Sequence, residues 1–118
     1  MGGSVYSQNL VPNPNFETFS NCPYNISQLN FAQPWISPTI ASPDYFNSCT
    51  STFGIDVPYN FGGFQFPLNG EGYAGAFFKA PEEYREYIQV QLESPMEAGV
   101  CYQVGYFVNA ANQYCGVT

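Results

Sequence analysis

Residues 84–111 read YREYIQVQLESPMEAGVCYQVGYFVNAA, two alternating runs joined by a short link. In the first run, one face carries Glu86, Ile88, Val90 and Leu92. In the second run, one face carries Tyr102, Val104, Tyr106, Val108 and Ala110. A period of two predicts a β-strand with one buried face for each run.

The link between these runs contains Ser94-Pro95 and Ala98-Gly99. Proline interrupts strand pairing because it lacks an N–H, and glycine permits a left-handed turn residue. A link of this length allows two arrangements. The strands either pair directly or arch between two sheets.

The composition indicates a single all-β domain of 118 residues. Aromatic residues make up 19% of the chain and charged residues 9%, which favours aromatic-rich strands over helices with charged outer faces. Eleven Gly and ten Pro supply turns between the runs. Residues 73–80 alternate as a further strand, whereas Asp44 to Gly63 reads as an aromatic loop that either covers the domain or binds a ligand.

The formal charge of −7, with nine acidic and two basic residues, argues against nucleic acid as a partner. Anionic membrane surfaces are disfavoured for the same reason. No apolar run approaches the roughly 20 residues that span a bilayer, so membrane insertion is not expected. Neutral glycans and proteins remain as partners.

The four cysteines, Cys22, Cys49, Cys101 and Cys115, are an even set without a C-x-x-C pair, and the chain has no His. This argues against zinc and favours disulfides, hence a location outside the cytoplasm. Three connectivities exist, and Cys22–Cys49 with Cys101–Cys115 closes the shortest loops. Buried free thiols are the alternative.

Several short motifs follow one another along the chain. They are Asn9 to Glu17 (NLVPNPNFE), Cys22-Pro23, Ala32-x-Pro34-Trp35, Pro43 to Cys49 (PDYFNSC), Tyr73-Ala74-Gly75 and Tyr84 to Gln89 (YREYIQ). This series, from Gln8 to about Asn109, resembles the N-terminal β-sandwich of exported Bacteroidota surface proteins. That group has the galactose-binding-domain-like fold of carbohydrate-binding modules. It includes gliding-motility-associated proteins and proteins with an OmpA-type peptidoglycan-binding domain.

The resemblance implies a jelly-roll β-sandwich over residues 8–118, preceded by a tail or signal-peptide remnant at residues 1–7. The resembled domains continue past the position of Ala111 with a further strand, so we expect a sandwich truncated at its C-terminus. Its open edge would invite a strand from a partner chain. Such modules often hold a structural Ca²⁺ between a Glu at the position of Glu17 and a C-terminal Asp. Without that Asp, the calcium site would be incomplete, and no other cofactor is expected.

The candidate ligand-binding residues are Trp35, Tyr45, Arg85, Tyr87, Gln89 and Gln91. Trp35 suits either the core, with its N–H bound to a backbone carbonyl, or a platform for a sugar ring. Arg85 suits either an ion pair with a nearby Glu or a clamp for a carboxylate or sugar hydroxyls. Tyr87, Gln89 and Gln91 form either a sugar-binding strip or a solvated strand face.

Catalysis is not expected. The absence of His removes the commonest general base and the Ser–His and Cys–His nucleophile systems, and no spacing pairs two carboxylates as a glycosidase needs. The sequence therefore predicts a non-catalytic, secreted or cell-surface carbohydrate-binding module. The alternative is a structural or adhesive spacer that contacts proteins through an open sheet edge.

Overall fold

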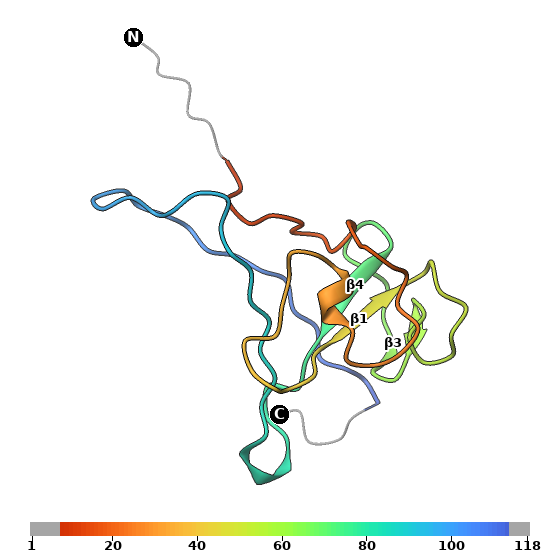
Figure 1. Ribbon diagram of the computed structural model, residues 1–118. Helices are drawn as coiled ribbons and strands as arrows, with labels where there is room; N and C mark the ends of the chain where they lie inside the picture. Colours follow the sequence, from red (N-terminus) through yellow and green to blue (C-terminus); the bar gives the residue numbers. More distant parts are fainter. Residues whose placement is uncertain (1–7, 114–118) are drawn as a thin grey trace.

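The computed structural model describes residues 8–113, in which two small antiparallel sheets lie at the centre and long extended segments surround them (Figure 1). The elements in chain order are η1 (Leu29–Phe31), β1 (Asp44–Asn47), β2 (Tyr59–Asn60), β3 (Gly63–Phe64), β4 (Gly72–Gly75) and η2 (Pro81–Glu83). The strands and the scarcity of helix agree with an all-β protein.

β1 pairs with β4, and Phe46 lies opposite Tyr73 in this pair. The Phe46 ring packs over Gly75 of β4. A Cβ at that position would lie 2.6 Å from the ring, so only glycine leaves room for it. Phe46, Ile55 and Val57 form the buried core cluster, with Tyr73 packed against it. The predicted strand at residues 73–80 is therefore confirmed in its first part, where small residues lie under an aromatic layer.

The interpretation of residues 44–63 as one loop was wrong at both ends. Asp44–Asn47 forms the central strand β1, and Tyr59–Asn60 forms β2, which pairs with β3. These strands are two to four residues long, too short to show an alternating pattern. Between them, residues 48–58 are irregular.

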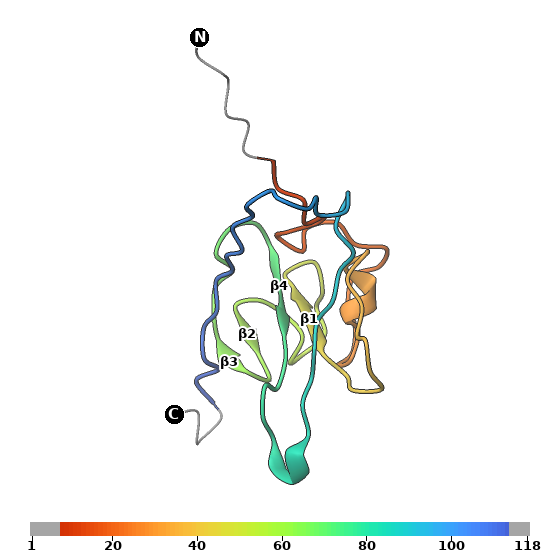
Figure 2. The ribbon, with the colours of Figure 1, turned by 90° about the vertical axis from the view of Figure 1, so that its left-hand side faces the viewer.

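The two runs of residues 84–111 do not pair with each other. Figure 2 shows residues 84–93 passing on the β1 side and residues 101–111 on the β3 side, with the link arching between them. In the first run, an isolated bridge joins Gln89 to Ile36. The two runs therefore do not pair directly, and neither joins one of the two sheets as a regular ladder.

The predicted buried faces of these runs are found only in part. Glu86 is buried and Val90 and Leu92 are half-buried, as the alternation of the first run requires, but Ile88 on the same face is 40% exposed. Every residue of the second run is exposed, so the expected buried face at residues 102–110 is wrong for this structure. Residues 101–108 make no backbone hydrogen bond within the described part of the chain, although the Asn109 side chain contacts that of Gln65.

The disulfide Cys22–Cys49 is present, which confirms the first predicted pair. Cys101 is exposed with a free thiol, and Cys115 lies outside the described residues, so the second pair stays a prediction. No helix among residues 8–113 has the length and apolar character needed to cross a bilayer.

Candidate functional site

An open groove of about 600 Å³ lies between the irregular segment after β1 and the β2–β3 hairpin. This volume is in the range of small-ligand sites, which is roughly 300–1,000 Å³. Its lining combines aromatic, hydroxyl, amide and carboxylate side chains: Ser51, Thr52, Phe53, Asp56, Tyr59, Asn60, Phe61 and Gln113, together with Gly54.

Aromatic rings line the groove and face solvent. Phe53 is 92% exposed and Tyr59 is 65% exposed. The Tyr59 ring meets the Phe64 ring edge-on, with 4.9 Å between centroids, so β3 holds Tyr59 from behind. Exposed aromatic rings on a supported hairpin can stack against the C–H face of a ligand.

Gly54 determines where the third aromatic ring lies. Its φ of +85° is in the left-handed region, and a Cβ there would lie 2.6 Å from the Phe61 ring. The Phe61 N–H also donates to the Gly54 carbonyl at 3.0 Å. Both the turn and the ring position therefore require glycine.

A buried polar network supports the groove from below. The Asn60 amide nitrogen donates to the Tyr73 hydroxyl at 2.6 Å, and the Asn60 amide oxygen accepts from the Gly62 N–H at 2.9 Å. The Tyr73 hydroxyl donates onward to the Gln65 carbonyl at 3.1 Å. Burial raises the pKa of Tyr73, so this hydroxyl stays neutral and keeps its donor role at ordinary pH.

Asp56 is the carboxylate of the groove lining. One of its oxygens accepts from the Val57 N–H at 2.7 Å, which fixes the side chain beside the aromatic rings. With the hydroxyls of Ser51 and Thr52 and the Gln113 amide, it offers hydrogen-bonding groups to a polyhydroxylated ligand.

Of the residues predicted to bind ligand, two lie with the N-terminal segment. The Trp35 Nε1–H donates to the Asn13 carbonyl at 2.8 Å, and its ring packs on Phe16 with centroids 4.8 Å apart. Trp35 thus makes the backbone hydrogen bond expected of its core alternative. Tyr45 is fully buried, so the expectation that it contacts a ligand is corrected: it is a core residue.

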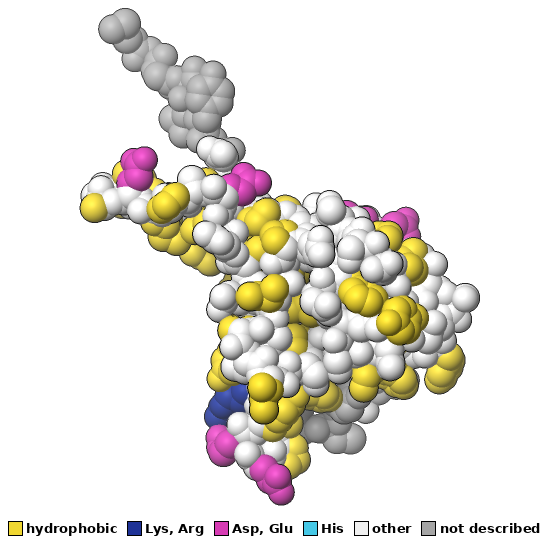
Figure 3. All heavy atoms as spheres, viewed as in Figure 1, with side chains coloured by type: hydrophobic (Ala, Val, Ile, Leu, Met, Phe, Trp, Pro, Cys, Tyr) yellow, Lys and Arg dark blue, Asp and Glu magenta, His cyan; other side chains and the backbone are white. Residues whose placement is uncertain are grey.

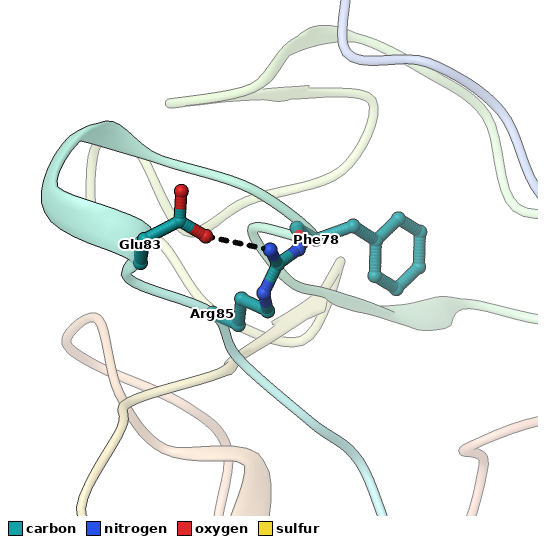
Figure 4. A network of polar contacts seen from close by, with 3 residues as sticks. All are labelled: Phe78, Glu83 and Arg85. Atoms are coloured by element: carbon teal, nitrogen blue, oxygen red, sulfur yellow. Dashed lines mark hydrogen bonds and ion pairs between the residues drawn. The ribbon is translucent and has the colours of Figure 1, made fainter.

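The other predicted residues lie on residues 84–93, away from the groove lining. Arg85 donates to the Glu83 carboxylate at 2.8 Å and to the Phe78 carbonyl at 3.3 Å (Figure 4). This is the ion-pair alternative. Tyr87, Gln89 and Gln91 are exposed, and their side chains make no hydrogen bond within residues 8–113.

The surroundings of Glu17 do not fit calcium. One carboxylate oxygen accepts from the backbone N–H groups of Glu71 and Gly72, at 2.8 and 3.0 Å. These two donors engage one of the two carboxylate oxygens, and calcium needs six or more oxygen ligands. Among residues 8–113, no group of three or more acidic or cysteine side chains is placed to hold a metal.

A second polar cluster surrounds the buried carboxylate of Glu86. It accepts from the Tyr84 hydroxyl at 3.0 Å, the Ser42 hydroxyl at 3.2 Å and the Phe77 N–H at 2.9 Å. These three donors satisfy a charge that would otherwise be costly to bury. We assign Glu86 to the fold, because it ties residues 42, 77 and 84 together.

Asp44 lies near this cluster, and its pKa is raised. Burial is the main cause; the Ser27 N–H, which donates at 2.6 Å, opposes the shift, and the charge of Glu86 adds to it. A raised carboxyl pKa contributes stability that is present at low pH and lost as pH rises through the folded-state value.

We expect Asp44→Asn to raise the melting temperature relative to the parent at pH 7, because the amide oxygen can still accept from Ser27 without a charge. The difference should shrink below pH 4, where the parent carboxyl is protonated. Thermal melts at pH 3, 5 and 7 measure this. A difference independent of pH would contradict the assigned role of ionisation.

Sequence reasoning did not single out Phe53, Tyr59, Phe61 or Asp56 as site residues. The one signal in the sequence is that aromatic residues accumulate in a Gly- and Pro-rich loop. That pattern fits a loop that covers the domain as well as it fits a loop that binds a ligand. Folding the hairpin back over residues 51–56 is what gathers these side chains.

The comparisons with known proteins add no relative. No protein-family model matches the chain, and neither a curated protein nor a solved structure shows significant similarity to it.

Proposed function

We propose that this chain is a non-catalytic carbohydrate-binding module of an exported cell-surface protein. The observation that carries the proposal is the groove, in which Phe53, Tyr59 and Phe61 lie beside Asp56. A sugar ring presents an apolar C–H face and a polar rim of hydroxyls. Rings paired with carboxylate, hydroxyl and amide groups match both parts.

The ligand class follows from charge. The groove lining contains an acidic side chain and, among the described residues, no basic one. With a chain charge of −7, acidic polysaccharides would be repelled. The proposed ligand is therefore a neutral glycan, bound through stacking and hydrogen bonds.

A binding role fits the groove better than hydrolysis does. Most glycosidases hold two carboxylates on either side of the scissile bond. Asp56 is the single carboxylate among the described residues of the lining, and Glu86 is buried with its oxygens engaged by donors. The groove thus has the parts for recognition and lacks a paired acid.

The location and the finer fold belong to the same proposal. The Cys22–Cys49 disulfide supports an oxidising compartment, such as the periplasm or the cell exterior. The resemblance to Bacteroidota surface modules supports a jelly-roll sandwich. It also supports a parent protein of the gliding-motility-associated or OmpA-type group.

The test is affinity electrophoresis against a panel of neutral polysaccharides, with an acidic one for comparison. Retention by at least one neutral polysaccharide is expected. Tyr59→Ala should weaken it about tenfold, because a lost stacking contact of about 1.4 kcal/mol corresponds to that factor.

Two further variants locate the site. Tyr24→Ala is the matched control, since Tyr24 is 62% exposed and does not line the groove, and its retention should equal that of the parent. Tyr87→Ala tests the strip predicted from sequence. Loss of retention in Tyr87→Ala but not in Tyr59→Ala would move the site to that strip, and no retention by any glycan would overturn the proposal.

A further inference from the structure

Residues 101–108 form an extended run that is exposed along its whole length (Figure 2). Tyr106 is 80% exposed and Phe107 is 83% exposed. Within residues 8–113, no backbone group of this run makes a hydrogen bond. A strand with free N–H and C=O groups and large apolar side chains is a template for pairing with another strand.

The body of the protein holds this run at its C-terminal end, and a contact with the link holds it at its start. After it, the Gln113 N–H donates to the Gly62 carbonyl at 3.2 Å, and the Phe64 N–H donates to the Asn112 side chain at 3.1 Å. Before it, the Tyr102 hydroxyl accepts from the Glu97 N–H at 2.8 Å. The run is therefore displayed beside β3 in an extended conformation.

Charge bears on the choice of partner. Residues 101–111 contain no charged side chain, although the chain as a whole carries −7. In the view of Figure 3, acidic side chains lie at the margins and on the protruding turns. A charge-free strip is where two copies of an acidic protein meet with the least repulsion.

The sequence of the run is also complementary to itself. In an antiparallel pair centred on Gly105, Tyr102 lies opposite Val108 of the second copy, and Val104 lies opposite Tyr106. The two-fold axis repeats each pair, so one face carries four aromatic–β-branched pairs. Such cross-strand pairs stabilise sheets, and glycine at the axis lets the two backbones approach.

We propose that residues 101–109 pair with the same residues of a second copy, as antiparallel strands about a two-fold axis at Gly105. The interface is isologous, so it closes at a dimer. This inference goes beyond glycan binding and does not depend on it, since no residue of the run lines the groove.

The test uses cysteine trapping in the full chain with Cys101→Ser and Cys115→Ser as background. Gly105→Cys places two thiols directly opposite each other, where Cβ atoms about 4.5–5.5 Å apart can form a disulfide under mild oxidation. Gln103→Cys is the matched control. Its counterpart lies four residues further along the partner strand, roughly 13 Å away.

The expected result is a cross-linked dimer for Gly105→Cys, at least tenfold more abundant than for Gln103→Cys. Sedimentation velocity of the background protein should show a concentration-dependent monomer–dimer equilibrium. Val104→Glu should weaken it at least tenfold, because the two introduced charges lie diagonally across the pair. Circular dichroism melts and glycan retention of each variant check that the fold and the groove persist.

Three results would overturn the proposal. They are a monomer at all concentrations up to the millimolar range, equal cross-linking at positions 103 and 105, and assemblies larger than a dimer. The first excludes self-association, the second excludes the register, and the third excludes closure by a two-fold axis.

Discussion

Replacing both Cys22 and Cys49 by serine is expected to lower the free energy of unfolding by about 3.5 kcal/mol. The disulfide joins residues separated by 27 positions, and the cross-link removes that much chain entropy from the unfolded state. For a domain of this length the loss corresponds to a fall in melting temperature of about 10–20 °C. Denaturant unfolding of the oxidised parent and the double variant measures it.

The matching experiment on Cys101 serves as the control. Cys101 is exposed with a free thiol, so Cys101→Ser should change the stability by less than about 0.5 kcal/mol. A loss of several kcal/mol would indicate that Cys101 pairs with Cys115. Alkylation of Cys22 and Cys49 in the native protein without prior reduction would show that the disulfide is absent, and would contradict the predicted loss of stability.

Tyr45→Phe is expected to cost about 2–4 kcal/mol of unfolding free energy, although it removes a single oxygen. The Tyr45 hydroxyl donates to the Phe16 carbonyl at 2.7 Å and accepts from the Asn47 amide at 2.8 Å, and Tyr45 has no exposed surface. Phenylalanine would leave the buried Asn47 amide without its partner, at about 1–3 kcal/mol, and the part-buried Phe16 carbonyl without its donor, at about 1 kcal/mol. Urea unfolding at pH 7 gives this difference.

The same residue makes a pH-dependent contribution. Burial raises the pKa of Tyr45 to about 12, from an ordinary value of 10.0. A raised pKa means that this stability is fully present below pH 10 and lost as pH rises through 12. The stability difference between the parent and Tyr45→Phe should therefore narrow between pH 10 and pH 12.

Tyr24→Phe is the control for both measurements, because the exposed Tyr24 hydroxyl makes no hydrogen bond within the described residues. It should change the stability by less than about 0.5 kcal/mol at any pH. A Tyr45→Phe variant as stable as the parent would show that the hydroxyl is hydrated and that Tyr45 is not in the core.

The sequence predicted the features that depend on local chemistry. The preference for short loops predicted the Cys22–Cys49 disulfide, and the composition predicted an all-β chain. The alternation of the first run predicted that Glu86 faces inward. Each of these follows from residues close together in the chain or from the overall composition.

The sequence did not predict which segments pair. Alternation assigned strands to residues 84–93 and 101–111, yet a strand forms a ladder only where another segment lies beside it. The central strand β1 was missed, because four residues between Pro43 and the turn at Ser48 show no period. Its partner β4 lies 28 residues away, and no local pattern specifies that distance.

The groove was missed for a related reason. Phe53, Tyr59 and Phe61 have no spacing that marks a site, and their convergence depends on Gly54 and on the buried Asn60–Tyr73 contact. By contrast, Tyr45 was a candidate ligand-binding residue within a stretch expected either to cover the domain or to bind a ligand. Whether an aromatic residue faces water depends on which segment covers it.

The pairing of β1 with β4 has a consequence for how the chain folds. Joining Asp44–Asn47 to Gly72–Gly75 requires a long intervening loop to close before any ladder bond forms, and loop closure loses entropy. Cys49 lies two residues beyond β1, so its bond to Cys22 anchors the start of that loop. That bond closes the segment before β1 and does not span residues 48–71, so joining β1 to β4 loses this loop's entropy in the oxidised and the reduced chain alike.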